Sequence, residues 1–161
     1  MTTEPIQAEP IATVIGGRAE PTDDYWGGTC SIIRLHDRFP VKTVQGLEEF
    51  SHLIVTWHFH LAAPDDVALH ARSPRNNPRW PATGTFAHRN HRRPNQLATS
   101  FPRLLRVEGL DLHVADLDAV AGTPVIDLAP YFPAMGPQGT VRVPQWVDEM
   151  LPDYWTTPGR P

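Results

Sequence analysis

The clearest hydrophobic pattern lies in residues 53–60, where apolar and polar positions alternate. Successive side chains of a β-strand point to opposite faces, so this alternation predicts a strand with one buried face. The odd-numbered positions are apolar. The second face ends in His58 and His60.

Shorter β-rich runs follow the same logic and are bounded by glycine, proline or other turn residues. Two of them flank Glu108-Gly109-Leu110 and predict a hairpin. Strands dominate the chain without alternating with helices, which favours a mainly β fold, an antiparallel barrel with short helices. The expected runs are residues 11–15, 29–35, 101–107, 111–115 and 124–128.

Two segments have helical spacing. In residues 44–51, Leu47 and Phe50 would share one face of a two-turn helix. Residues 145–151 predict a second short helix, which ends before a proline. The aromatic residues around it are too apolar to remain in water, so we expect them to pack on the body of the protein or on a second subunit. They are Trp146, Tyr154 and Trp155.

A chain of 161 residues is most simply one domain. We expect a barrel core at about residues 10–137 and a tail at residues 138–161. The 18 prolines argue against long helices. Residues 62–81 form a long proline- and arginine-rich loop, and long ordered loops are often binding elements.

The chain has no apolar run long enough to span a bilayer, and its polar, acidic start is unlike a signal peptide. A single cysteine, Cys30, excludes an internal disulfide and a zinc site built from several thiolates. We therefore expect a cytoplasmic protein that does not enter the membrane.

Charge is unevenly distributed along the chain. The net charge is −4, which argues against a general nucleic-acid binder. However, no Asp or Glu lies in residues 67–107, which hold eight of the 14 basic residues. This segregation favours a local anion site. The eight are Arg72, Arg75, Arg79, Arg89, Arg92, Arg93, Arg103 and Arg106.

The most basic part of this region is residues 84–100, GTFAHRNHRRPNQLATS. Its first residues, Thr85-Phe86-Ala87, predict a strand, and Pro94-Asn95 predicts a turn. The guanidinium fork suits bidentate binding of carboxylate or phosphate. The alternative is a solvated loop that happens to be basic.

The same stretch resembles the signature G-x-F-A-x-R-S-x-x-R-P-N-P-I-G of the TsaA/TrmO-like family. Residues 46–60 and 122–131 also resemble that family, in the same order and spacing. The chain departs from the family at Asn90, where Ser is usual, at Gln96-Leu97-Ala98, where Pro-Ile-Gly is usual, and at Ala121, where Asp is usual. The matching positions of the signature are Gly84, Phe86, Ala87, Arg89, Arg93, Pro94 and Asn95.

The resemblance implies a TsaA-like β-barrel, commonly a homodimer, that uses S-adenosylmethionine to methylate N6 of threonylcarbamoyladenosine in tRNA. The chain lacks the G-x-G-x-x-G of Rossmann methyltransferases, as a barrel enzyme would. An arginine would hold the cofactor carboxylate and an acid its hydroxyls or amine, although Asp116 and Asp118 could simply form turns. The implied cofactor contacts are Gly27, Gly28, His60, Arg89, Thr99, Asp116, Leu117, Asp118 and Ala119.

We expect the basic face to be exposed and to receive an anionic acceptor, with tRNA as the first candidate. Its predicted residues are Arg72, Arg75, Arg92, Arg93 and Asn95. The departures from the family, and the short chain after Pro137, leave open a small-molecule methyltransferase or a non-catalytic cofactor-binding module on the same barrel. No catalytic base is assigned.

A metal-dependent hydrolase around His58 and His60 is the remaining alternative. It would need His88 or His91 as a third ligand, and no carboxylate motif accompanies the pair. The sequence therefore favours histidines that are satisfied by neighbours or line the site, without a metal.

Overall fold

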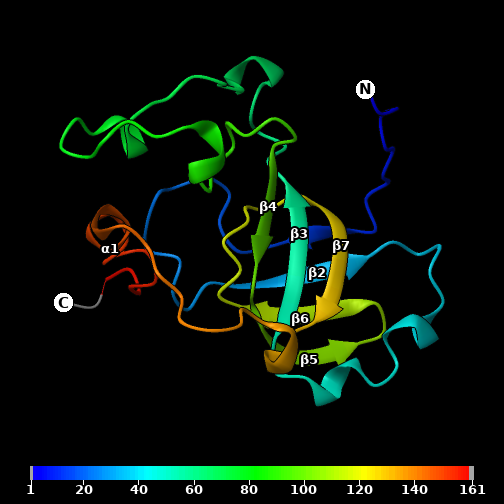
Figure 1. Cartoon of the computed structure of the whole chain (residues 1–161). Coiled ribbons are helices and arrows are strands. Elements are labelled where there is room, and N and C mark those ends of the chain that lie inside the picture. The colour runs from blue at the N-terminus through cyan, green and yellow to red at the C-terminus, as the bar shows by residue number, and fades with distance from the viewer. Residues whose placement is uncertain (1, 160–161) are drawn as a thin grey trace.

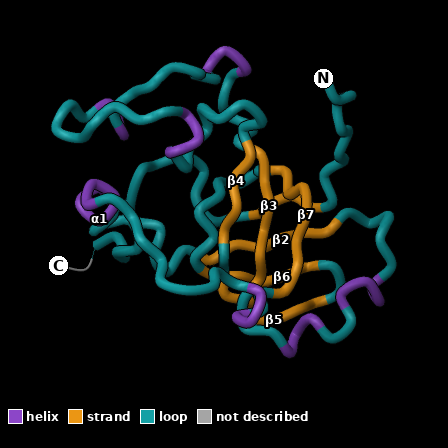
Figure 2. Tube along the Cα trace, in the orientation of Figure 1, coloured by secondary structure: helices purple, strands orange, loops and turns teal. Residues whose placement is uncertain are grey.

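The computed structural model describes residues 2–159. Its ordered elements are mostly strands, joined by loops and short 3₁₀ turns, as Figure 2 shows. The strands are β1 (Ala12–Ile15), β2 (Cys30–Leu35), β3 (Leu53–His58), β4 (Leu97–Ser100), β5 (Arg103–Glu108), β6 (Asp111–Ala115) and β7 (Pro124–Pro130). The α-helix α1 (Gln145–Met150) follows them, and confirms the helix predicted there.

All seven strands belong to one antiparallel sheet in the order β4-β3-β7-β1-β2-β6-β5. The mainly β fold is thus confirmed. In Figure 1, β3, β4 and β7 run steeply across β2, β5 and β6, so the sheet folds over on itself. It is not fully closed. An isolated bridge between His52, just before β3, and Arg103, at the start of β5, joins the two ends of the strand order.

One hydrophobic core lies between the two halves of this sheet. Leu53, Val55 and Trp57 of β3 are buried, as the alternating pattern predicted. They pack with buried residues from the crossing strands, such as Ile33 of β2 and Leu112 of β6. Burying a side chain of this kind contributes about 1.5–3 kcal/mol to stability.

A bend between β4 and β5 carries the chain from one edge of the sheet to the other. It falls at Phe101 and Pro102, where proline cannot donate to a ladder. The Leu53 amide donates to the Pro102 carbonyl over 3.1 Å, and the Leu104 amide to the Ser51 carbonyl over 2.8 Å. This bend fixes the residues of β4 that precede it, which belong to the candidate site.

Three local predictions were wrong or incomplete. Residues 44–51 do not form one helix but two 3₁₀ turns, η1 (Val41–Val44) and η2 (Leu47–Glu49). Gly46 separates them with a φ of 84°, which a continuous helix cannot contain. The predicted strand at Thr85–Ala87 is the 3₁₀ turn η5. Strand β4 was not predicted.

The long segment between β3 and β4 projects from the sheet, drawn in green in Figure 1. It carries no strand but is internally braced. The Ala68 amide donates to the Arg92 carbonyl, and Arg72 pairs with Thr83 in an isolated bridge. Two further 3₁₀ turns in it are η3 (Pro64–Asp66) and η4 (Pro74–Asn76), and η6 (Pro133–Met135) follows β7. No helix in the described part of the chain has the length and apolarity to cross a membrane.

Candidate functional site

Asp116 stands where the chain leaves β6, with a backbone φ of 61° that aspartate tolerates better than most residues. The Gly28 amide donates to Asp116 Oδ1 over 2.8 Å, and Arg103 Nε donates to Oδ2 over 2.7 Å. Burial acts to raise the pKa of Asp116, but these bonds outweigh it and hold the pKa below its usual value. The carboxylate therefore ties the glycine loop to the end of β6.

Asp118 accepts hydrogen bonds from two hydroxyl groups. Ser100 donates to Oδ1, and Tyr154 donates to Oδ2. The residues on either side of Asp118, Leu117 and Ala119, are buried in the core. The core thus anchors the 116–119 segment through Leu117 and Ala119, while the side chains of Asp116 and Asp118 remain among polar groups.

These contacts form a hydrogen-bond chain across several elements. Trp57 Nε1 donates to Ser100 Oγ over 2.9 Å, and Ser100 and Tyr154 both donate to Asp118. Burial raises the pKa of the Tyr154 phenol, and the charge of Asp118 raises it further. The phenol therefore keeps its proton at neutral pH and remains a donor. The chain links β3, β4 and the 116–119 segment to the C-terminal tail.

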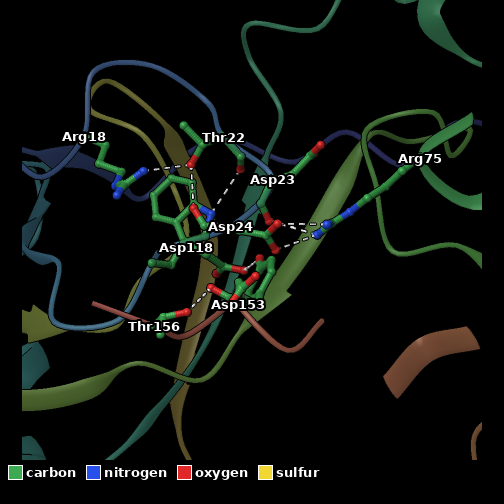
Figure 3. A network of polar contacts seen from close by, with 10 residues as sticks. Arg18, Thr22, Asp23, Asp24, Arg75, Asp118, Asp153 and Thr156 are labelled. Carbon is green, nitrogen blue, oxygen red and sulfur yellow. Dashed lines mark hydrogen bonds and ion pairs between the residues drawn. The ribbon is translucent and has the colours of Figure 1, made fainter. Parts of the chain in front are cut away.

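The tail returns to the loop that precedes β2. The amides of Tyr25 and Trp26 donate to the tail carbonyls of Asp153 and Tyr154 over 3.0 and 2.8 Å. Gly27 is buried, and a Cβ there would overlap the backbone carbonyl of Trp155. The need for glycine at this position therefore follows from contact with the tail. Figure 3 shows Asp118, Asp153 and Thr156 gathered beside this loop.

The outer edge of β4 is covered by two arginines. Arg89 Nη2 donates to the Thr99 carbonyl over 2.7 Å, and Arg93 Nη2 donates to the Leu97 carbonyl. In an antiparallel ladder the amide and carbonyl of one residue point to the same side. The amides of Leu97 and Thr99 therefore also face outward, towards the two guanidinium groups.

No carboxylate pairs with Arg89 or Arg93 among residues 2–159. Burial lowers the pKa of Arg93, and the positive charge of Arg89 lowers it further. Two neighbouring guanidinium groups without an acid, beside outward-facing amides, form a set of donors suited to an anionic group.

His60 follows the end of β3, and its Nε2 lies near Gly122, 3.5 Å from where a Cβ would stand. It therefore lies close to the segment that contains Ala119 and the preceding acids. Burial lowers the pKa of His60, and the positive charge of His58 adds to this.

The histidines proposed to complete a metal site have other neighbours. His88 Nε2 lies 3.0 Å from the Thr83 hydroxyl, and the His91 ring packs edge-on against Phe59 at 6.1 Å. Within the described residues, no three His, Cys, Asp or Glu side chains are grouped to hold a metal ion.

The predicted acceptor-binding residues do not form one cluster. Arg93 lies at the edge of β4, whereas Arg72 and Arg92 lie around Asn90. Arg72 Nη2 and the Arg92 amide both donate to Asn90 Oδ1, over 3.1 and 3.0 Å. Burial lowers the pKa of Arg72, and the charge of Arg92 lowers it further. Both arginines are half-buried rather than exposed. Asn95 is exposed at the turn before β4.

Arg75 is exposed as a residue, but its charge is paired within the chain. Its two Nη atoms donate to both carboxylate oxygens of Asp24, each over 2.9 Å, and its side chain is only 25% exposed. Figure 3 shows this bidentate pair. The charge of Arg75 is therefore neutralised within the chain, and it fastens the long loop to the Asp23-Asp24 loop.

These positions can be compared with known proteins. The family described as the tRNA-methyltransferase O N-terminal domain matches residues 21–136. The chain belongs to this TrmO family. Two crystal structures of TrmO from Pseudomonas aeruginosa share its fold, with TM-scores of 0.72 and 0.68. They are 24% and 25% identical to it, covering 90% and 86% of this chain and 63% and 62% of theirs.

The tRNA (adenine(37)-N6)-methyltransferase of Escherichia coli is 38% identical over 56% of the chain and 40% of its own length. The human protein of that name is 32% identical over 71% of the chain and 24% of its own length. A protein of Methanothermobacter thermautotrophicus named "Probable S-adenosyl-L-methionine-binding protein" is 38% identical over 57% of the chain and 63% of its own length. The chain thus spans less than two thirds of each relative.

Sequence reasoning missed four residues that contribute to the candidate site. Ser100 adjoins a predicted contact, and Arg103 belongs to the basic region, so both were within reach of local inspection. Asn90 was noted only as a departure from the family signature. Tyr154 was noted only as an apolar tail residue, because its contact with Asp118 joins distant segments.

Proposed function

We propose that this chain is an S-adenosylmethionine-dependent methyltransferase that acts on N6 of an adenine in tRNA. One observation carries the proposal: predicted cofactor contacts from separate segments are joined by hydrogen bonds. Gly28 binds Asp116 across 88 positions of sequence, and Arg89 binds the Thr99 carbonyl. Ser100, adjacent to Thr99, joins this group to Asp118.

The donor and acceptor groups suit the chemical parts of this cofactor. The guanidinium groups of Arg89 and Arg93, with the outward amides of β4, would bind the methionine carboxylate. Asp116 and Asp118 would accept from hydroxyl or ammonium groups, because each carboxylate oxygen has a second lone pair beyond the bond it accepts here. Their negative charge also favours a cationic sulfonium nearby.

The cofactor brings an activated methyl group, so the protein must mainly orient the reactants and exclude water. Trp57, Ser100 and Tyr154 would serve by holding Asp118 in one orientation. The buried Leu117 and Ala119 would fix the backbone of that segment against the core. Rigid support of this kind matters because small displacements of reacting groups slow a transfer strongly.

An RNA acceptor is supported by the names of the E. coli and human relatives and by the acid-free loop. The Arg72 guanidinium donates to neutral acceptors, the Ala68 carbonyl and Asn90 Oδ1. Neither Arg72 nor Arg92 pairs with a carboxylate in residues 2–159, so both charges would be available to phosphates. Phosphate contacts would make RNA binding fall steeply with salt.

The direct test is methyl transfer from labelled S-adenosylmethionine to tRNA that carries threonylcarbamoyladenosine at position 37. We expect labelled RNA, and none with a matched tRNA that has a different base there. Label appearing only on a small molecule would favour the small-molecule alternative. Cofactor binding without transfer to either would favour a binding module.

We also propose that residues 1–161 act as one domain, with a core at about residues 10–137 and the tail 138–161 folded on it, and that two copies form a cytoplasmic homodimer. The contacts of Tyr154 support the first point. Exposed apolar side chains of the tail, such as Val141 and Trp155, support the second. Light scattering at tens of micromolar protein should give twice the chain mass, and a monomer would contradict the dimer.

A further inference from the structure

Phe86 is an aromatic side chain that the long loop between β3 and β4 leaves in solvent. It lies in the middle of η5 and is 82% exposed. The loop around it is nevertheless well held: Thr85 is buried and its hydroxyl donates to the Arg92 carbonyl over 3.4 Å. His88 is also buried, and its ring faces Trp146 of α1 at 6.4 Å. The turn therefore presents an aromatic ring from a braced support.

The charges around Phe86 are positive and mostly lack acidic partners. Of the eight arginines in residues 67–107, only Arg75, Arg103 and Arg106 pair with carboxylates within residues 2–159. The Arg72 guanidinium and the backbone amide of Arg92 both donate to Asn90 Oδ1, and the Thr85 hydroxyl, next to Phe86, donates to the Arg92 carbonyl.

We propose that Phe86 is a stacking platform for an unpaired base of an RNA loop, with Arg72 and Arg92 receiving its phosphates. The inference rests on the proposed RNA acceptor and adds Phe86 as a residue that would bind one of its bases. An aromatic face beside a basic groove is how proteins hold single-stranded nucleic acid, because every base has a face that can stack. Half-buried arginines that pair with no carboxylate in residues 2–159 fit a polyanion better than they fit another copy of this acidic chain.

The test uses fluorescence anisotropy with a labelled tRNA anticodon stem–loop, and a blunt RNA duplex of equal length as comparison. Phe86→Ala should weaken stem–loop binding roughly fivefold or more, the usual range for loss of one stacked base. Phe86→Trp should retain binding, whereas Phe86→Leu, which is apolar but has no ring, should behave like alanine. None of the three should change affinity for the duplex or for S-adenosylmethionine.

Met135→Ala is the matched control, because Met135 is equally exposed, at 81%, but lies on η6 outside the acid-free loop. It should leave stem–loop binding unchanged. Arg72→Ala and Arg92→Ala should instead reduce the dependence of binding on salt, which Phe86→Ala should not.

Two results would overturn the inference while leaving the proposed acceptor intact. One is a wild-type protein that binds the stem–loop and a Phe86→Ala variant that binds it equally well. The other is a Phe86→Ala variant that is monomeric by light scattering where the wild type is a dimer, because Phe86 would then be covered by a second copy. Failure of the wild type to bind any RNA at low salt would reject the acceptor itself.

Discussion

At the scale of single residues, Gly27 must remain a glycine because the backbone of the C-terminal tail covers it. A side chain there would overlap the Trp155 carbonyl, so Gly27→Ala should displace the tail and lower the free energy of unfolding by about 1–3 kcal/mol. Gly84→Ala is the control, because nothing lies near its Cβ position and its φ is −67°. Urea unfolding of both variants tests this. Equal stability of the two would show that the tail does not pack on Gly27.

Asp116 gives a pH dependence with a definite sign. Its folded pKa lies below the unfolded value of about 3.9, so its contacts stabilise the fold fully above that pH. The stabilisation is lost as the pH falls through the lower folded pKa. The difference in unfolding midpoint between wild type and Asp116→Asn should therefore shrink towards acid pH. Asp127→Asn, at an exposed site on β7, is the control. A pH-independent difference for Asp116→Asn would contradict the assignment.

At the scale of elements, Arg75 fastens the long loop through its bidentate bond to Asp24. Arg75→Ala should speed amide hydrogen exchange in residues 72–83 while leaving β3 and β7 protected, since local opening does not require the sheet to unfold. Arg79→Ala is the control, because Arg79 is exposed and pairs with no carboxylate in residues 2–159. Unchanged exchange in Arg75→Ala would mean that the loop is held by its other contacts alone.

The elements also show how far sequence patterns reach. Strand β3 was predictable because one of its faces is buried, which forces strict alternation. Strand β4 was not, because it is a short edge strand without a repeating pattern, and its outer edge is covered by Arg89 and Arg93. The η5 turn resembled a strand in composition, but its three residues are too few to show a period. Residues 44–51 had helical spacing, yet Gly46 interrupts the helix.

The candidate site shows the same limit. The family resemblance indicated Arg89 and Thr99, and a direct hydrogen bond joins the Arg89 side chain to the Thr99 carbonyl. The partners of Asp118 are separated from it by 18 and 36 positions, and no local pattern encodes such contacts. The absence of acids from residues 67–107 predicted an anion site, but it could not reveal that Arg75 forms an ion pair with Asp24, far away in the sequence.

At the scale of the whole molecule, the folded-over sheet is what brings the site together. The bend between β4 and β5 delivers Ser100 to the 116–119 segment, and the returning tail adds Tyr154 from the other end of the chain. The central claim is that this assembly binds S-adenosylmethionine through Arg89.

Titration calorimetry with S-adenosylmethionine tests that claim most directly. The wild type should bind, and Arg89→Ala should bind roughly tenfold or more weakly, the effect of losing a charge-assisted bond of about 1.5–3 kcal/mol. Arg34→Ala, which removes an arginine paired with Asp111 outside the site, should bind like the wild type. An Arg89→Ala variant that folds normally and keeps full cofactor affinity would contradict the account.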